Sequence, residues 1–229
     1  MHFKRVIVVV CAVAITACQA NAPSSAMADA PALSEKTSVE TAEPPVDYAN
    51  ESPSQENELM TEQLHAFAEG NTKILDIQQG DLTGDGGQGA ALVLDHPGTG
   101  SEKLGEGEPR SLLLIMRDSA GKLQQVGRND LLIPCAQCGG MAGDPFGYIQ
   151  VNEGRFTVLT EGGSRERWSN EYTFKYSAEQ QDWLLEKTVW TMADTETGEE
   201  RRIELTSKEF GSIRFDELVP ETLQKVANK

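Results

Sequence analysis

The feature that most constrains the fold is a series of short strand-like segments between residues 73 and 205. Within them, apolar residues alternate with polar ones or form compact apolar runs, and turn sequences rich in Gly, Asn and Asp separate them. No helical pattern lies between consecutive strands, so parallel βαβ units are not expected. We therefore expect a mostly β antiparallel meander, as a sandwich, a partial barrel or a curved sheet. The expected strands are 73–79, 90–94, 112–116, 122–126, 148–151, 156–159, 172–176, 183–190 and 202–205.

Short helices are expected at both ends of this β domain, which we assign to residues 59–229. A stop signal, Gly70-Asn71, follows the first helical pattern, and residues 217–226 are expected to form the last helix. One face of the first helix gathers its apolar residues, which are Leu59, Met60, Leu64, Phe67 and Ala68.

Residues 19–58 differ in composition from the domain that follows. Ala, Pro, Ser, Glu and Thr dominate, and eight acidic residues face a single base, Lys36. Such a segment buries too little apolar surface to offset its ordering entropy. With Cys18 it forms an expected disordered, acidic Pro/Ala/Ser-rich linker over residues 18–58.

The first eighteen residues have the pattern of a secretion signal. Lys4 and Arg5 precede an apolar stretch from Val6 to Ile15, which is too short to span a bilayer. The sequence Ile15-Thr16-Ala17-Cys18 resembles the lipobox of bacterial lipoproteins. That resemblance implies removal of residues 1–17 and acylation of Cys18, for example with palmitate. The alternative is a plain signal peptide in which Cys18 stands by chance.

The resemblance also implies a location. Stable anchoring takes two or more acyl chains, which the lipoprotein family carries on this cysteine. Gln19, rather than Asp, after the cysteine implies sorting to the outer membrane, with the domain in the cell envelope and facing the periplasm.

The net charge of the chain is strongly negative. Loss of Lys4 and Arg5 with the signal segment shifts the formal net charge from −16 to −18. Such acidity argues against nucleic acid as a partner.

The segment from Gly80 to Gly86, GDLTGDG, resembles the GDxNGDG calcium loop of FG-GAP and VCBS repeats. The resemblance implies oxygen ligands at Asp81, Thr83 and Asp85, because calcium takes six to eight oxygens. The family's ninth position, usually Asp, is glycine here, and no second copy exists, which excludes a full propeller. The alternative is a tight turn whose Asp side chains cap backbone amides. We expect no other cofactor.

Cys135 and Cys138 form a CxxC motif with three interpretations. A zinc site needs four ligands, and His65 and His96 are not at useful spacing. A thioredoxin-type redox pair opens a helix in a βαβ context, which this sequence lacks. A disulfide suits the oxidising envelope and is the simplest interpretation, with redox activity and metal binding as the alternatives.

Gly-rich, aromatic and charged loops near this motif predict one concave binding patch. Exposed aromatic and arginine residues are typical of recognition surfaces. The alternative is that the aromatic residues plug the ends of the sheet. Residues 135–146 and 162–168 resemble uncharacterised envelope lipoproteins. The expected ligand-binding residues are Asp144, Phe146, Arg165, Arg167 and Trp168.

No catalytic residue is expected, because the sequence has no GxSxG elbow and no P-loop. We expect an outer-membrane lipoprotein whose non-enzymatic β domain binds an envelope protein or a glycan. The acylated cysteine adds contact with outer-membrane lipid. The alternatives are a calcium-stabilised adhesion or assembly module and a carboxylate-dependent hydrolase of envelope polymers.

Overall fold

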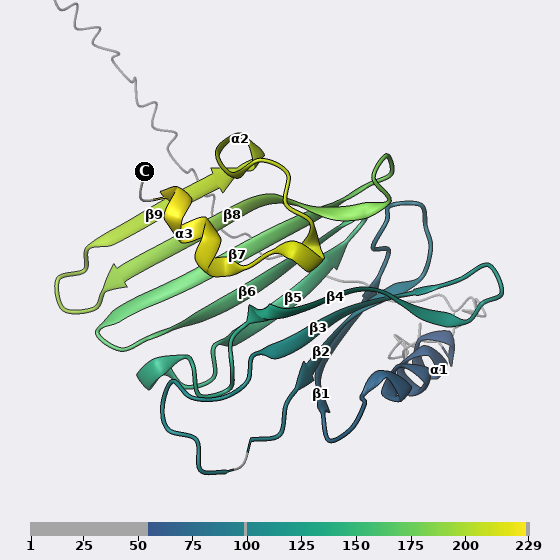
Figure 1. Cartoon of the computed structure of the whole chain (residues 1–229), viewed down its shortest axis with the longest axis horizontal. Helices are drawn as coiled ribbons and strands as arrows, with labels where there is room; N and C mark the ends of the chain where they lie inside the picture. Colours follow the sequence, from purple (N-terminus) through teal and green to yellow (C-terminus); the bar gives the residue numbers. More distant parts are fainter. Residues whose placement is uncertain (1–54, 99, 228–229) are drawn as a thin grey trace, which may run out of the picture. The chain divides into compact units, whose positions relative to one another are not determined.

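The computed structural model describes residues 55–98 and 100–227, and about half of these residues lie in two antiparallel β-sheets (Figure 1). The first sheet has the order β1-β2-β3-β4 and the second the order β5-β6-β7-β8-β9, so consecutive strands are neighbours. The expected mostly β meander with short terminal helices is therefore confirmed. Within the described residues the two sheets stay separate and do not close into a barrel.

The first sheet consists of β1 (Lys73–Gly80), β2 (Gly89–Asp95), β3 (Arg110–Arg117) and β4 (Leu123–Ile133). The second consists of β5 (Phe146–Asn152), β6 (Arg155–Gly163), β7 (Glu166–Ser177), β8 (Asp182–Asp194) and β9 (Glu200–Thr206). The α-helices are α1 (Gln55–Leu64), α2 (Ser207–Phe210) and α3 (Pro220–Ala227). The 3-10 helices are η1 (His65–Phe67), η2 (Gly140–Ala142) and η3 (Phe215–Glu217).

The central strands of the first sheet, β2 and β3, are buried on both faces. The outer face of this sheet packs against α1 through Met60 and Leu64, and its inner face packs against the second sheet. Residues 89–94 of β2 and 110–115 of β3 are all buried. A strand covered on both faces needs apolar residues at successive positions, which explains why both strands have compact apolar runs in the sequence.

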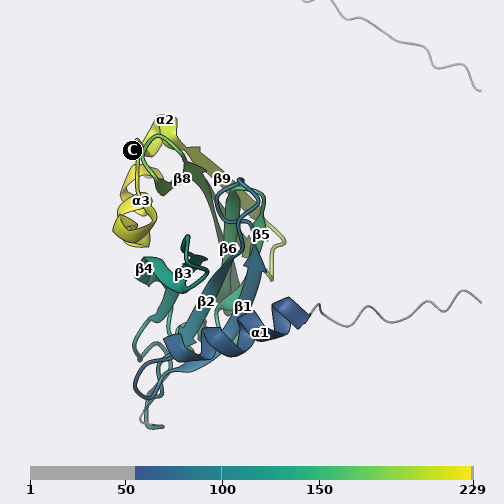
Figure 2. The same cartoon turned by 90° about the vertical axis from the view of Figure 1, so that its right-hand side faces the viewer.

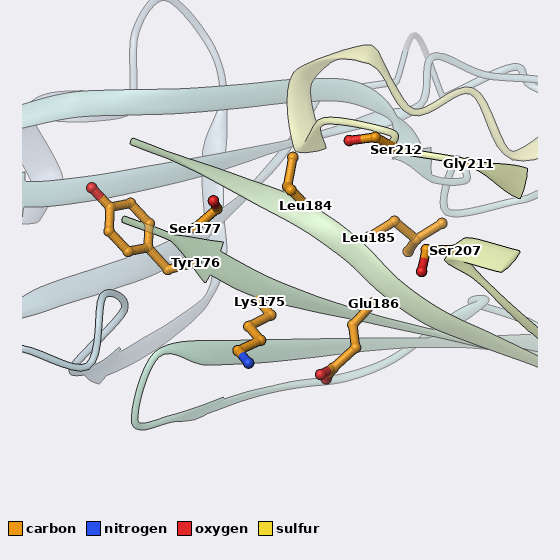
Figure 3. Close-up of a pocket in the computed structure, with 9 residues that line it drawn as sticks. All are labelled: Lys175, Tyr176, Ser177, Leu184, Leu185, Glu186, Ser207, Gly211 and Ser212. Atoms are coloured by element: carbon orange, nitrogen blue, oxygen red, sulfur yellow. The ribbon is translucent and has the colours of Figure 1, made fainter. Parts of the chain in front are cut away.

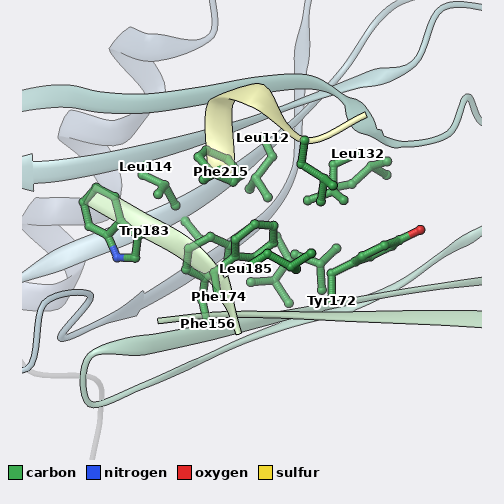
Figure 4. Packing of buried hydrophobic residues seen from close by; sticks show 14 of the residues in the cluster. Leu112, Leu114, Leu132, Phe156, Tyr172, Phe174, Trp183, Leu185 and Phe215 are labelled. Atoms are coloured by element: carbon green, nitrogen blue, oxygen red, sulfur yellow. The ribbon is translucent and has the colours of Figure 1, made fainter. Parts of the chain in front are cut away.

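Aromatic rings fill the centre of the core between the two sheets (Figure 4). Phe156 and Phe174 stack with their centroids 4.9 Å apart, and Phe215 meets each of them edge-on at 5.4 Å. Phe215 belongs to η3, which contacts both β4 and β8. Figure 2 shows α3 on the same side of the second sheet as β4. The C-terminal segment therefore completes the core.

Two buried polar side chains connect distant segments. The Asn129 Nδ2 group donates to the carbonyls of Phe215 and Leu218 at 2.6 and 3.0 Å. The Trp183 Nε1–H donates to the carbonyl of Leu82 at 2.7 Å. Because a buried polar group is costly unless it is paired, each bond favours one arrangement of the segments that it joins.

The helices differ from expectation at their ends. α1 begins at Gln55 rather than near Leu59, and Leu59 is 53% exposed, so its assignment to the buried face is wrong. Met60 and Leu64 face the sheet because residues four positions apart lie on the same side of a helix. Leu59, one residue before Met60, points to another side of the helix and is exposed. The last helix begins at Pro220 rather than at residue 217, because the fixed φ and missing N–H of proline suit the first helical position.

Strand ends differ as well. β4 continues to Ile133 rather than to residue 126, and β7 begins at Glu166, so the expected Gly-rich loop at 162–168 is the end of a hairpin. A register irregularity between Ile74 and Asp76 leaves Leu75 40% exposed.

Residues 1–54 lie outside the described residues, and with them the expected signal segment, Cys18 and most of the expected linker. The described part of the chain begins inside that linker, at the start of α1. Among the described residues, no helix is both long and apolar enough to cross a membrane.

Candidate functional site

Arg110 lies at the start of β3 on its inner face, in phase with Leu112, and is only 1% exposed. Its Nε–H donates to Asp95 Oδ1 at 2.8 Å. Its two terminal nitrogens donate to the two carboxylate oxygens of Asp144, each at 2.6 Å. Asp95 ends β2, and Asp144 lies between η2 and β5. This Arg110 cluster (Arg110, Asp95 and Asp144) therefore joins the first sheet to the segment that enters the second.

Charge pairing holds the Arg110 cluster in its ionised form. Burial lowers the pKa of Arg110, but hydrogen bonds from its guanidinium to Asp144 and Asp95 raise it above the usual value. Burial raises the pKa of Asp144, but Arg110 and the Phe146 amide hold it below its usual value. A bidentate guanidinium–carboxylate pair has a fixed geometry, so the cluster is a rigid anchor.

An acidic cleft of about 520 Å³ lies beside this cluster, between the β2–β3 loop and the CxxC loop. Its size falls within the range of small-ligand sites. Among the described residues, its lining includes four carboxylates and one lysine, Lys73. Asp95 belongs to both the Arg110 cluster and the cleft, so the buried arginine fixes part of the cleft lining. Polar and sulfur-containing side chains from the end of β2 and from both loops contribute to the lining, among them Asp95, His96, Glu106, Glu108, Cys135 and Gln137.

A disulfide forms one wall of the acidic cleft. Cys135 and Cys138 are bonded, with their Cα atoms 5.0 Å apart, which confirms the simplest interpretation of the CxxC motif. The Gly105 amide donates to the Gln137 carbonyl at 2.8 Å, so the disulfide loop also holds the β2–β3 loop. Gly107 has φ +139° and lies against Cys135, where an added Cβ would come within 3.1 Å of the Cys135 Cβ. Both walls of the cleft are therefore tied together.

His96, in the cleft lining, contacts a polar network around the buried Ser111 on the outer face of the first sheet. The Ser111 hydroxyl donates to Asp130 Oδ1 at 2.5 Å and accepts from Arg128 Nη2 at 3.0 Å. The only proton of the Ser111 hydroxyl is donated to Asp130. The His96 Nε2 atom, 3.1 Å from the Ser111 oxygen, must therefore donate a hydrogen bond to that oxygen. The other ring nitrogen lies 3.9 Å from Glu108. Ser111 is fully buried, so this Ser-His-Glu set does not present an activated nucleophile.

Comparison with protein-family models, with curated proteins and with solved structures finds no match for this chain. Function is therefore inferred from the geometry and chemistry of the residues themselves.

The GDLTGDG segment forms a turn in which carboxylates cap backbone amides. Asp81 Oδ1 accepts from the Thr83 and Gly84 amides at 3.1 and 2.7 Å, and Oδ2 accepts from Gly86 at 2.7 Å. Asp85 Oδ1 accepts from the Thr83 hydroxyl at 2.7 Å. The described residues contain no group of three or more His, Cys, Asp or Glu side chains placed to hold a metal. The geometry matches the capped-turn interpretation.

Replacing Asp81 by Ala is expected to lower the free energy of unfolding by about 1–2 kcal/mol, because three amides lose their acceptor. Burial raises the pKa of Asp81, but the Gly86, Gly84 and Thr83 amides hold it below its usual value. The stabilisation is therefore present above about pH 4, the unfolded value, and is lost as the pH falls. Urea unfolding at pH 7 and pH 3 checks this, with the exposed Glu179→Ala as control.

Calcium is expected to leave the melting temperature of the wild-type protein unchanged, because the Asp81 oxygens are already occupied by amides. Thermal melts with calcium and with chelator measure this. A rise in melting temperature that Asp81→Ala abolishes would instead establish a calcium site at Asp81, Thr83 and Asp85.

Three of the five residues expected to bind a ligand lie on strands of the second sheet, and they are divided between its two faces. Trp168 pairs with Gly162 and covers it, since an added Cβ there would come within 2.5 Å of the indole. Phe146 packs against the core on the same inner face. Arg167, the neighbour of Trp168 in β7, lies on the opposite face, because successive side chains of a strand point to alternate faces of the sheet.

The remaining two residues are engaged in ion pairs. Arg165 pairs with Asp194 at 2.8 Å and with Glu196 at 3.0 Å, at neighbouring hairpin ends. Asp144 belongs to the Arg110 cluster. The structure thus brings Phe146 and Trp168 to one face, and it places Asp144 near the acidic cleft rather than in a common patch with the two arginines.

Sequence reasoning missed Arg110, Asp95 and His96. A signal for the first of these was present, because Arg110 is in phase with the apolar residues Leu112 and Leu114 of the buried strand. A charged residue on a buried strand face requires partners, and it therefore marks a place where acidic residues must converge.

A second hollow, the β8 groove, has a volume of about 510 Å³ (Figure 3). It lies where β8 passes the segment that follows β9. Lys175 and Glu186 extend to the same side of the sheet in Figure 3, and Ser207 and Ser212 come from the segment beyond β9.

Proposed function

We propose that this protein is a lipid-anchored outer-membrane lipoprotein whose non-enzymatic β domain binds a cationic group of an envelope protein in the acidic cleft. The observation that carries the proposal is an acidic cleft of about 520 Å³ whose lining is fixed by a buried arginine and by a disulfide. Preorganised walls reduce the ordering cost of binding.

The charges of the acidic cleft favour a lysine or arginine side chain as its occupant. Glu106 and Glu108 belong to the β2–β3 loop, and the Glu108 side chain is 83% exposed, so ligand contact requires little desolvation of that carboxylate. Asp95 lies deeper, with its side chain 30% exposed, where a charge interaction is less screened by water. Exposed carboxylates at the rim would speed the encounter, and the deeper one would strengthen the complex.

The tether supplies the location. Acylation of Cys18 would hold the domain at the outer membrane, and the acidic linker would let it stand away from the bilayer. A cleft for basic side chains would then face the proteins of the periplasm.

A photo-crosslinking amino acid placed at Gln137 tests the cleft in living cells. Gln137 is exposed and lines the cleft. We expect a defined protein adduct from this position, and its loss when Glu106→Gln and Glu108→Gln are combined, because the cationic group loses its partners. The matched control carries the same group at Glu179, an exposed residue between β7 and β8.

Equal adducts from positions 137 and 179, or an adduct that the two charge-neutralising substitutions leave unchanged, would contradict the proposal. An adduct of polysaccharide rather than protein would also contradict it, and would instead indicate a glycan as the ligand.

A further inference from the structure

The β8 groove exists because two different segments pair with successive parts of the same strand. β9 pairs with β8 from Lys187 onward. Before that residue, Leu185 donates its amide to the Ile213 carbonyl at 2.8 Å, and Leu184 bridges to Arg214. The change of partner occurs next to Glu186, which is skipped in the pairing with β7. The groove opens at this interruption (Figure 3).

Positive charge gathers on the outer face of the sheet beside the groove. Arg155 and Lys175 stand directly opposite each other on β6 and β7. Directly opposed like charges destabilise a sheet unless something compensates them. Hydrogen bonding to Arg155 lowers the pKa of the Glu186 carboxyl group, and the nearby positive charges of Lys175 and Lys187 lower it further.

Glu186 does not satisfy all of these cations. Both of its carboxylate oxygens accept hydrogen bonds from Arg155, at 2.9 and 3.2 Å. Within the described part of the chain, Lys175 and Lys187 form no ion pair. The group therefore keeps an excess of positive charge in a protein of formal net charge −16.

Two serine hydroxyl groups, from the segment beyond β9, form part of the lining of the β8 groove. Ser207 and Ser212 both line the groove, and among the described residues neither side chain makes a hydrogen bond. Leu184 and Tyr176 add apolar surface next to them. Ammonium and hydroxyl donors around a shallow hollow, with apolar surface beside them, are complementary to a phosphate group that carries an organic substituent.

We propose that the β8 groove binds a phosphate-bearing ligand, with Lys175 pairing with the phosphate and with Ser207 and Ser212 donating hydrogen bonds to its oxygens. Lys187 supplies further positive charge, and Leu184 contacts the organic part of the ligand. This site is separate from the acidic cleft and does not depend on the function proposed for it. The phosphate can belong to a small phosphate ester or to a phospholipid headgroup, which share this chemistry.

Calorimetric titration of the full-length protein in a non-ionic detergent tests this site, with inorganic phosphate and monomeric dihexanoyl phosphatidylglycerol as probes. We expect phosphate to bind, and Lys175→Gln to weaken binding by about tenfold or more. The double substitution Ser207→Ala and Ser212→Ala should weaken it as well. Lys122→Gln, which removes one positive charge from the β3–β4 hairpin, is the matched control and should bind like the wild type.

Absence of phosphate binding to the wild type, or equal weakening by Lys175→Gln and Lys122→Gln, would overturn the proposal. Tighter binding of the phospholipid than of phosphate would support a headgroup as the natural ligand. Equal or weaker binding of the phospholipid would support a small phosphate ester.

Discussion

Replacing Arg110 by Ala is expected to lower the free energy of unfolding by about 3 kcal/mol, because it leaves two carboxylates without their counter-charge. The expected loss lies at the low end of the range for breaking a buried ion pair. The reason is that water partly solvates the two carboxylates, since the Asp95 and Asp144 side chains are 30% and 47% exposed. Loss of the packed arginine stem adds to the effect. Urea unfolding at neutral pH measures the change.

Arg128→Ala is the matched control for Arg110→Ala. Arg128 also lies on the first sheet and pairs with an aspartate, Asp130, but its side chain is 41% exposed. A pair of this kind contributes about 0–1 kcal/mol. Equal losses for the two variants would contradict the role of the Arg110 cluster as an anchor.

The effect of Arg110→Ala should also depend on pH. The pKa of Asp144 is held below its usual value, so this carboxylate contributes stability above about pH 4, its unfolded value. That contribution is lost as the pH falls through the folded pKa. The difference between wild type and Arg110→Ala should therefore shrink in acid, which unfolding measurements at pH 7 and pH 3 would show.

The fold class could be predicted because its signals are local. The compact apolar runs of β2 and β3 and the turn at 118–121 each depend on a few consecutive residues. The disulfide could be predicted for a similar reason, since Cys135 and Cys138 are only three residues apart in sequence.

What could not be predicted depends on contacts distant in sequence. Arg110 finds Asp144 in a loop beyond the next strand, and no local pattern pairs these two residues. Phe215 completes the core from a C-terminal 3-10 helix whose sequence has no strong periodicity. The exposure of Leu75 follows from a register irregularity that is visible only once β1 is paired with β2.

The predicted ligand patch was affected by the same limitation. Phe146 and Trp168 share a face, but Arg167 lies on the other face because the segment that contains it is a strand and not a loop. Alternation along β7 separates residues that are adjacent in sequence. The acylation of Cys18, in contrast, is predicted from a short contiguous motif, and that prediction does not depend on the folded domain.

Cys18→Ser is expected to have the largest effect of all on location, because it removes the single thiol to which the acyl chains would be attached. A protein with two or more acyl chains stays in a membrane. Among the described residues, no helix is long and apolar enough to replace such an anchor. Cys11→Ser is the matched control, because that cysteine lies within residues 1–17 and would leave with the signal segment.

The most direct test of the proposed lipid-anchored binding domain is therefore palmitate labelling and membrane fractionation of the wild type, Cys11→Ser and Cys18→Ser. The account predicts that the wild type and Cys11→Ser are labelled and sediment with the outer membrane. It predicts that Cys18→Ser carries no label and remains soluble. A Cys18→Ser protein that is still labelled and membrane-bound, or a wild type that never takes up label, would contradict it.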